Sequence, residues 1–450
     1  MTRHKPVIGL PMVRRISLIL SAALISFPGF AIVNAQDTGP LPARQQTILT
    51  LESAVRSAVK WYPSIDQAIA ALSASSQDIK EAQAGYRPQV SAGIGPSMSI
   101  TGGTSWRPRA TLSASQMLYD FGKVGSSVDR AKAAERASRA ELLLAVDNLS
   151  RNTSFSVIEA QRYRALLTIA QEQLTSLEEI NGLVQLRVRR GASTRSDGSQ
   201  AEARIEAARA TILQITAEVQ RWESNLRYLV GWEGPLDVAP DVPDWLGRAC
   251  RVHEPDWDQL PSVMQSVAKR DEAQAAYRGA RAAGLPTVSM GADVDTNLRD
   301  PFAQRNDVTV GITVSSSLYQ GGARKARESA SFHMLESADA ALKAARIEAG
   351  RTLAENSEQI DSLIERFATL GKRRADMEET GTLYRLQYFQ LGTRTLLDLL
   401  NAQQEYHQTR FDEVNAVHDM RRLNVDCLYY SGALRDAYAL TGTIVRGVTL

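Results

Sequence analysis

The side chains that most often carry chemistry are spread along this 450-residue chain without forming a recognisable site. Ser57-Ala58-Val59-Lys60 fits the S-x-x-K pattern of a serine nucleophile and its lysine, but the companion motifs are missing. The sequence also lacks a phosphate-binding glycine loop, a paired-cysteine metal site and a nucleophile elbow. The histidines do not stand at metal-ligand spacings, and they are His4, His253, His333, His407 and His418. We therefore expect a protein that is not an enzyme and that holds no metal or cofactor.

Cysteine chemistry is limited to Cys250 and Cys427. In an exported protein these two residues can form a disulfide. The sequence leaves this pairing and a pair of unpaired buried thiols equally open. Neither cysteine occupies a lipobox position after the N-terminal segment, so we expect no lipid anchor on a mature N-terminal cysteine.

The first 35 residues have the features of a secretory signal peptide. Arg14 and Arg15 precede an apolar stretch, Ile16 to Val33, and Val33-Asn34-Ala35 fits a small-residue cleavage site. The alternative is an N-terminal membrane anchor, which the helix-breaking Pro28-Gly29 disfavours. No other segment approaches 18 uninterrupted apolar residues, so we expect no transmembrane helix in the mature chain.

Charge argues against nucleic acid as a partner. The full chain has 52 basic and 50 acidic residues. Cleavage after residue 35 would remove four basic residues and no acidic ones, which leaves the mature chain slightly acidic. A nucleic-acid-binding protein usually carries a clear basic excess.

The sequence contains a long duplicated unit with a spacing of about 200 residues. Leu118-Tyr119-Asp120-Phe121-Gly122 corresponds to Leu318-Tyr319-Gln320-Gly321-Gly322, and Arg190-Gly191-Ala192-Ser193 corresponds to Leu391-Gly392-Thr393-Arg394. Proline is absent from 109–234 and 302–450, so each copy has room for very long helices. We predict helices over 51–85, 123–190, 194–231, 260–283, 323–391 and 394–432.

Within the first long helix, residues that are apolar with one exception, Asn181, recur at alternating intervals of three and four residues, as in a coiled coil. These seam residues are Leu167, Ala170, Leu174, Leu177, Asn181, Val184 and Val188. His407 and His418 lie on one predicted helix and are expected at its surface or in such a seam. At 1.5 Å per residue each of the two longest helices would span about 100 Å.

Two hairpins with a period of two separate the short helices from the long ones. Val308, Val310, Ile312 and Val314 alternate with threonine, glycine and serine, and a similar alternation occurs at 288–294, 90–94 and 110–114. The intervening loops are predicted at Pro96–Trp106 and Thr296–Asp307. One face would be apolar, and the other would hold threonine, serine and glycine, which favours lipid on one side and a water-filled lumen on the other.

Tyrosines stand at the ends of these strands, where a membrane barrel places interfacial aromatic residues. They are Tyr86, Tyr119 and Tyr319, and ordinary partial burial is the alternative for them. Four strands cannot close a barrel, and open sheet edges cannot face hydrocarbon. A membrane barrel would therefore have to be shared among several copies of the chain.

These features together resemble the TolC family of outer-membrane efflux and type I secretion channels. The closest motif is the stretch from Leu391 to Ala402, which is similar to the family's second periplasmic helix–turn–helix. The resemblance covers the mature chain and implies a mainly helical fold with a small β part. It implies a homotrimer with a shared 12-stranded barrel in the outer membrane and an α-barrel across the periplasm. It also implies a periplasmic adaptor and an inner-membrane ABC or proton-driven transporter as partners.

The resemblance also assigns roles near the two helical turns. Asp398 matches a constricting aspartate ring, and the next ring position is Asn401. Arg394 matches the arginine of the closed-state latch, Asp197 matches its acidic partner, and Phe389 stands where the family has a tyrosine. Both aspartates would alternatively serve only to stabilise a helix N-terminus. Gly191 and Gly392 would end the long helices and mark the adaptor-docking turns.

We interpret the chain as a passive exit duct of a tripartite type I secretion or efflux system. The expected parts are a signal peptide (1–35), a first repeat (36–234), a linker (235–259), a second repeat (260–432) and a C-terminal segment (433–450). The alternative is a periplasmic coiled-coil adaptor or scaffold, whose sheets would pack on its own core.

Overall fold

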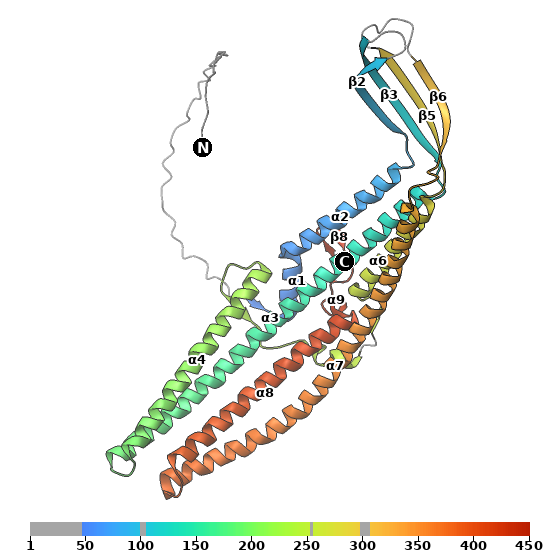
Figure 1. Ribbon diagram of the computed structural model, residues 1–450. Helices are drawn as coiled ribbons and strands as arrows, with labels where there is room; N and C mark the ends of the chain where they lie inside the picture. Colours follow the sequence, from blue (N-terminus) through green and yellow to red (C-terminus); the bar gives the residue numbers. More distant parts are fainter. Residues whose placement is uncertain (1–46, 100–104, 253–254, 298–306) are drawn as a thin grey trace, which may run out of the picture. The chain divides into compact units, whose positions relative to one another are not determined.

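Long helices and a four-stranded antiparallel sheet are the main elements of the described part of the chain (Figure 1). The computed structural model describes residues 47–99, 105–252, 255–297 and 307–450. The predicted signal peptide, His4 and His253 lie outside these residues. None of the described helices combines the length and the apolarity needed to cross a membrane.

The two longest helices are α3 (Lys123–Arg189) and α7 (Ala323–Leu386). They confirm the prediction drawn from the proline-free stretches. Each begins after a glycine in the left-handed conformation, Gly122 with φ 91° and Gly322 with φ 86°. In the first copy Asp120 adds a side-chain cap, because its carboxylate accepts hydrogen bonds from the backbone N–H groups of Gly122 and Val124. The second copy has Gln320 at this position.

Each long helix turns back into a 36-residue partner, α4 (Arg195–Val230) or α8 (Leu396–Ser431). The helical hairpins α3–α4 and α7–α8 end in turns at the end remote from the sheet (Figure 1). Apolar packing near these turns involves Leu177, Val184 and the additional residue Ile180, which is fully buried. The seam is therefore wider than the predicted three-four pattern.

The helix predicted over 51–85 is interrupted. It forms α1 (Leu51–Trp61) and α2 (Pro63–Ala84), with Tyr62 in an extended conformation between them. A residue before proline disfavours the helical region, and proline is well suited to the first helical turn. In the second copy the short helix is α6 (Pro261–Ala282), which also starts at a proline.

The described strands of the hairpins form one sheet with the order β2-β3-β5-β6. Their bounds are β2 (Gln89–Ser99), β3 (Ser105–Tyr119), β5 (Thr287–Asn297) and β6 (Asp307–Ser315). All neighbouring pairs are antiparallel. The strands extend into both predicted loops, since Pro96 to Ser99 and Thr296 belong to strands, and the remaining loop residues 100–104 and 298–306 lie outside the described residues.

The register keeps the apolar residues of neighbouring strands on one face. Ala92 pairs with Leu112, Leu112 pairs with Val294, and Val294 pairs with Val308. Because side chains alternate along a strand, the serine, threonine and glycine positions share the other face. This confirms the two-faced pattern, with one correction. The polar face also carries charged residues near the loop end of the sheet, namely Arg109, Asp293, Asp295 and Asp307.

A linking segment crosses from α4 to α6 and is attached to both hairpins. It contains β4 (Leu236–Val238), which pairs in parallel with β1 (Thr47–Leu49), then η1 (Leu246–Arg248) and α5 (Ala249–Val252). Gln161 on α3 donates a 2.6 Å hydrogen bond to the carbonyl of Ala239. A disulfide joins Cys250 of α5 to Cys427 of α8, with a Cα–Cα distance of 5.2 Å.

The C-terminal residues complete the hydrophobic core that lies beside the middle of the long helices. They comprise α9 (Leu434–Ala437) and the short strands β7 (Ile444–Val445) and β8 (Val448–Thr449). Tyr438 is fully buried there, and its hydroxyl lies 2.6 Å from that of Ser154. Arg435 and Asp147 form a buried ion pair at 2.7 Å.

Candidate functional site

The turns of the two hairpins carry the residues that the sequence singled out as a gate. Gly191 follows the end of the long helix of the first hairpin and has a φ of 71°. Gly392 follows the end of the long helix of the second hairpin and has a φ of 66°. A side chain at this conformation would be strained, which explains glycine at both positions. The next helix of each hairpin begins after a threonine N-cap, Thr194 or Thr395.

Both candidate gate aspartates belong to capping boxes. The Oδ2 atom of Asp197 accepts hydrogen bonds from the backbone of Thr194 at 3.0 Å and from the hydroxyl of Ser193 at 2.6 Å. Asp398 likewise accepts from the hydroxyl of Thr395 at 2.9 Å and from its backbone at 3.3 Å. Hydrogen bonding to the charged form lowers the pKa of both carboxyl groups. Each aspartate therefore stabilises the start of a helix, independently of any role at a pore constriction.

A one-residue insertion distinguishes the second turn from the first. The last turn before Gly392 is a π-helix, η2 (Gln387–Leu391). Ala192, just after Gly191, donates its backbone hydrogen bond to the carbonyl of Arg187, five residues back. Thr393, just after Gly392, reaches back six residues to Gln387. Such π-bulges are rare and concentrate at functional sites.

The inserted turn directs Tyr388 into the contact between the hairpins. Tyr388 is only 5% exposed, and its hydroxyl lies 3.1 Å from that of Ser193 in the first turn. Arg187 places its guanidinium 4.9 Å from the Tyr388 ring centre and donates to the carbonyls of Tyr388 and Phe389 at 3.1 and 3.2 Å. We name Arg187, Ser193, Asp197 and Tyr388 the tip latch.

The tip latch places a phenol beside the position that the family resemblance marks. Phe389 stands at the family's tyrosine position but contributes its backbone carbonyl and a partly buried ring. The neighbouring Tyr388 supplies the phenol that reaches Ser193. Sequence reasoning noted Tyr388 only as the tyrosine that adjoins Phe389, and it missed Arg187 and Ser193. The small drift in the spacing between the repeats signals the insertion.

The remaining candidate residues lie close to the tip latch without joining it. Arg394 donates to the side chain of Gln387 at 3.2 Å and lies 4.6 Å from the ring centre of Tyr384. It thus contacts neither aspartate by a hydrogen bond. Asn401 accepts a 3.3 Å hydrogen bond from Arg204 of α4, which is a further link between the two hairpins.

A groove of about 550 Å³ separates the ends of α3 and α7 beside the tip latch. Leu183 and Leu186 line it from α3, and Leu383 and Leu386 line it from α7. These leucines correspond to one another in the two repeats and are spaced three residues apart, so each pair presents one helical face. Leu183, Leu383 and Leu386 are exposed in the single chain.

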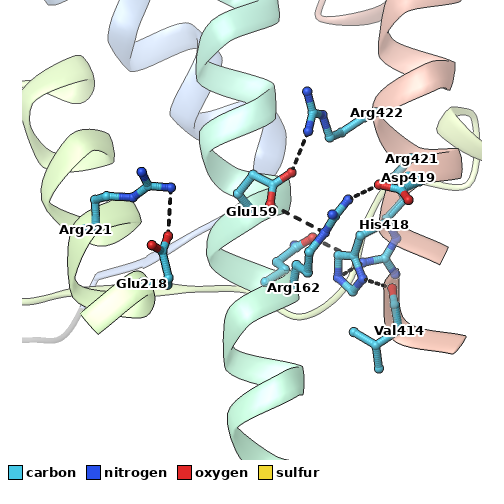
Figure 2. A network of polar contacts seen from close by, with 10 residues as sticks. Glu159, Arg162, Glu218, Arg221, Val414, His418, Asp419, Arg421 and Arg422 are labelled. Atoms are coloured by element: carbon cyan, nitrogen blue, oxygen red, sulfur yellow. Dashed lines mark hydrogen bonds and ion pairs between the residues drawn. The ribbon is translucent and has the colours of Figure 1, made fainter. Parts of the chain in front are cut away.

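Polar pairs also join α3 and α8 farther along the two helices (Figure 2). Arg422 donates to the buried Glu159 at 3.0 Å, and Arg162 pairs with Asp419 at 2.5 Å. His418 lies in the same seam, and the guanidinium of Arg421 is 3.2 Å from its Nε2 atom.

Both histidines of α8 are buried in the helix seams rather than at the surface. Burial lowers the pKa of His407 to about 4, and it lowers the pKa of His418 to about 4 as well. The Nδ1 atom of His418 lies 2.8 Å from the carbonyl of Val414, so this nitrogen carries a proton and donates it to that carbonyl. Among the described residues no group of histidine, cysteine and carboxylate side chains could hold a metal ion.

The strand-end tyrosines lie where the sheet meets the helices. Tyr119 is the last residue of β3, Tyr86 precedes β2 and Tyr319 follows β6. All three are exposed in the single chain. Phe121 adds a fourth aromatic ring, 4.6 Å from that of Tyr119, and holds a left-handed φ of 56° that is unusual for its type.

Comparisons with known proteins agree with this architecture. The family model for outer membrane efflux proteins matches residues 54–232 and 258–425. The chain is 23% identical over 388 residues to the outer membrane efflux protein BepC of Brucella suis, covering 82% of each protein. It is 28% identical over 241 residues to nodulation protein T of Rhizobium leguminosarum, covering 53% of this chain and 44% of that protein.

Solved structures show the same fold at low sequence identity. The outer membrane protein VceC of Vibrio cholerae superposes with a TM-score of 0.74 at 20% identity, covering 85% of this chain and 96% of VceC. CusC gives a TM-score of 0.75 at 20% identity, covering 85% of this chain and 91% of that one. Since the family model spans both repeats, this chain belongs to the outer membrane efflux protein family and is a channel of tripartite efflux systems in the outer membrane of Gram-negative bacteria.

Proposed function

We propose that three copies of this chain assemble into one passive exit duct for a type I secretion or efflux system. Each copy would contribute four strands to a shared 12-stranded barrel and four helical columns to an α-barrel. We divide the chain into a signal peptide (1–35), repeats at 36–234 and 260–432, a linker at 235–259 and a C-terminal segment at 433–450.

The sheet carries this proposal. Its outer strands β2 and β6 each have one edge without a partner among the described residues. Ile312 of β6 is 67% exposed and shares an exposed apolar face with Val308, Val310 and Val314. An apolar face suits lipid, but unpaired backbone edges in hydrocarbon cost several kcal/mol for each group. Edge-to-edge closure with other copies removes this cost, and three copies give an even strand number in the range of bacterial barrels.

At the opposite end we propose that the tip latch keeps the duct closed. It joins the two hairpins of one chain through the phenol of Tyr388 and the guanidinium of Arg187. Separating the hairpins at the turns would break these contacts together. Asp398 would add negative charge to the closed aperture, and the adaptor would dock at the turns marked by Gly191 and Gly392.

The adaptor or scaffold alternative is not favoured. The family match covers both repeats, and it is a family of channels. An adaptor would be expected to have one helical hairpin flanking a β-domain. Here two helical hairpins of similar length accompany one open sheet, which is formed by strands of both repeats.

A matched pair of substitutions on β6 tests the assembly. Ile312 and Thr313 are neighbours, both exposed in the single chain, and point to opposite faces of the sheet. Ile312→Asp would place a charge in lipid, which is destabilising and most costly near the bilayer centre. Thr313→Asp would place the same charge in the water-filled lumen.

We expect the Thr313→Asp protein to fractionate with the outer membrane as a trimer that conducts ions in planar bilayers. The Ile312→Asp protein should fail to insert or to assemble. Equal behaviour of the two variants would count against a lipid-facing apolar face, and a monomeric wild-type protein in detergent would exclude the shared barrel.

A further inference from the structure

A chain of hydrogen bonds runs from α8 to α3 and on to the linking segment between the repeats. The Nη1 atom of Arg421 lies 3.2 Å from the Nε2 atom of His418 and donates to the side chain of Gln161 at 3.2 Å. Gln161 in turn donates to the carbonyl of Ala239 at 2.6 Å. We name His418, Arg421, Gln161 and Ala239 the seam relay. It connects the second hairpin, through α8, with the first hairpin and the linking segment.

The seam relay requires a neutral histidine. An arginine side chain has only hydrogen-bond donors, so its contact with His418 needs a lone pair on Nε2. The other ring nitrogen already donates to the carbonyl of Val414 (Figure 2). A proton on Nε2 would set two donors against each other and place a second positive charge beside Arg421. Arg421 holds the ring and Gln161 with the same Nη1 atom, so it cannot leave the ring without disturbing Gln161.

Burial makes the seam relay a property of the single chain. His418 is 5% exposed and Gln161 is 6% exposed. Contact with further copies of the chain can only add to this burial. The seam relay therefore does not depend on how many copies assemble.

Charged groups surround His418 from its own helix and from α3. Burial is the main reason that the pKa of His418 falls to about 4, and the positive charges of Arg421 and Arg162 lower it further. The hydrogen bond from Nδ1 and the negative charge of Asp419 act in the opposite direction. On the linking segment, the negative charge of Asp241 acts on Arg421. The α7 residues that line a cavity together with Asp419 are uncharged, and they are Gln359, Ser362 and Leu363.

We propose that His418 is a proton-sensitive joint between the two hairpins. In its neutral form it keeps Arg421 on Gln161, which holds the linking segment on α3. When the ring takes up a proton, Arg421 moves away and the seam relay opens. The hairpins then separate more easily at this level, and this last consequence rests on the proposed duct.

Proton linkage gives the size of the effect. The pKa of His418 is about 4 in the folded chain and 6.5 for an ordinary ring. The open form therefore binds more protons, and the closed form loses stability as pH falls from 6.5 towards 4. Between pH 8 and pH 5 the opening equilibrium should rise about 30-fold.

Hydrogen–deuterium exchange of the detergent-solubilised full-length protein measures this opening. Peptides that cover residues 236–246, from β4 to η1, are followed at pH 8 and pH 5, with exchange corrected for the chemical rate at each pH. In the wild type we expect protection of this segment to be about 30-fold lower at pH 5. His418→Gln keeps an acceptor but cannot take up the proton, so its protection should not change with pH.

Gln161→Met is the second variant. Methionine fills the buried site but removes the bridge between Arg421 and Ala239. We expect the linking segment of this variant to be weakly protected at pH 8 and to lose no further protection at pH 5. This result does not require that His418→Gln folds.

His407 provides the matched control. It lies on α8, it is 3% exposed, and burial lowers its pKa to about 4 as well. Its Nδ1 atom has no hydrogen-bond partner among the described residues, and it does not belong to the seam relay. His407→Gln should therefore keep the wild-type response to pH in the linking segment.

Protection that is equal at pH 8 and pH 5 in the wild type would overturn the inference. So would an acid response that persists in His418→Gln or Gln161→Met, or one that disappears in His407→Gln. Planar bilayers separate this inference from the duct. Acid should raise the open probability of the wild type but not of His418→Gln, whereas a wild type without conductance would refute the duct and leave the exchange result intact.

Discussion

The tip latch makes a quantitative prediction for Tyr388→Phe. The hydroxyl of Ser193 has one hydrogen, which it donates to Asp197 at 2.6 Å, so the Tyr388 hydroxyl must donate to Ser193 across 3.1 Å. Phenylalanine keeps the buried ring and its contact with Arg187 and removes only this hydrogen bond. A buried hydrogen bond contributes about 1 kcal/mol to stability.

In a trimer the three latches would together contribute about 3 kcal/mol, which corresponds to a change of roughly 100-fold in the closed-to-open equilibrium. The assay is the open probability of single channels in planar bilayers. Entry of a large hydrophilic antibiotic into cells that express each variant provides a second readout. We expect Tyr388→Phe to open more often and to sensitise the cells.

Tyr384→Phe is the matched control for this experiment. Tyr384 lies one helical turn earlier on α7, and its hydroxyl makes no hydrogen bond with other described residues. Its ring contact with Arg394 does not need the hydroxyl. Wild-type open probability in Tyr388→Phe, or an equal rise in Tyr384→Phe, would refute the latch.

Three further predictions concern other parts of the chain. Asp398→Asn keeps an acceptor oxygen for the capping box but removes the charge, whereas Asp398→Ala removes both. Both variants should weaken block by divalent cations if the aspartates form a ring, and only the alanine variant should lower the thermal midpoint, because it loses the capping-box hydrogen bonds to Thr395. Unchanged block in both variants would restrict Asp398 to capping. Cys427→Ala removes the disulfide that closes a loop of 177 residues, so the free energy of unfolding should fall by about 5 kcal/mol. An unchanged thermal midpoint in the variant would exclude the bond. So would alkylation of both cysteines of the wild-type protein without reductant. Since the folded pKa of His418 is depressed to about 4, the unfolded chain binds more protons below pH 6.5, and the free energy of unfolding falls as pH drops from 6.5 towards 4. At pH 5 this amounts to about 2 kcal/mol, which His418→Gln should abolish; parallel pH curves for variant and wild type would contradict it.

The sequence by itself determined the large elements of this protein. Proline-free stretches rich in helix-forming residues left little alternative to α3 and α7, because no residue interrupts the hydrogen-bond ladder. Alternating residues such as Val308 and Val310 fixed the strands and their apolar face, since the side chains of a strand alternate by geometry. Because the unit is duplicated, an element predicted in one copy could be compared with the corresponding segment of the other copy.

Only the tertiary structure decided which side chains meet. From the sequence, Asp197 and Asp398 could each be a gate residue or a helix cap. The fold shows that each of them caps a helix. The contact between Tyr388 and Ser193 joins residues 195 positions apart, and it depends on a π-bulge that rotates the helix end by one residue. Such a rotation reflects packing between two hairpins, which local propensity does not encode. The pairing of Cys250 with Cys427 was open for the same reason, because sequence separation says nothing about distance in space.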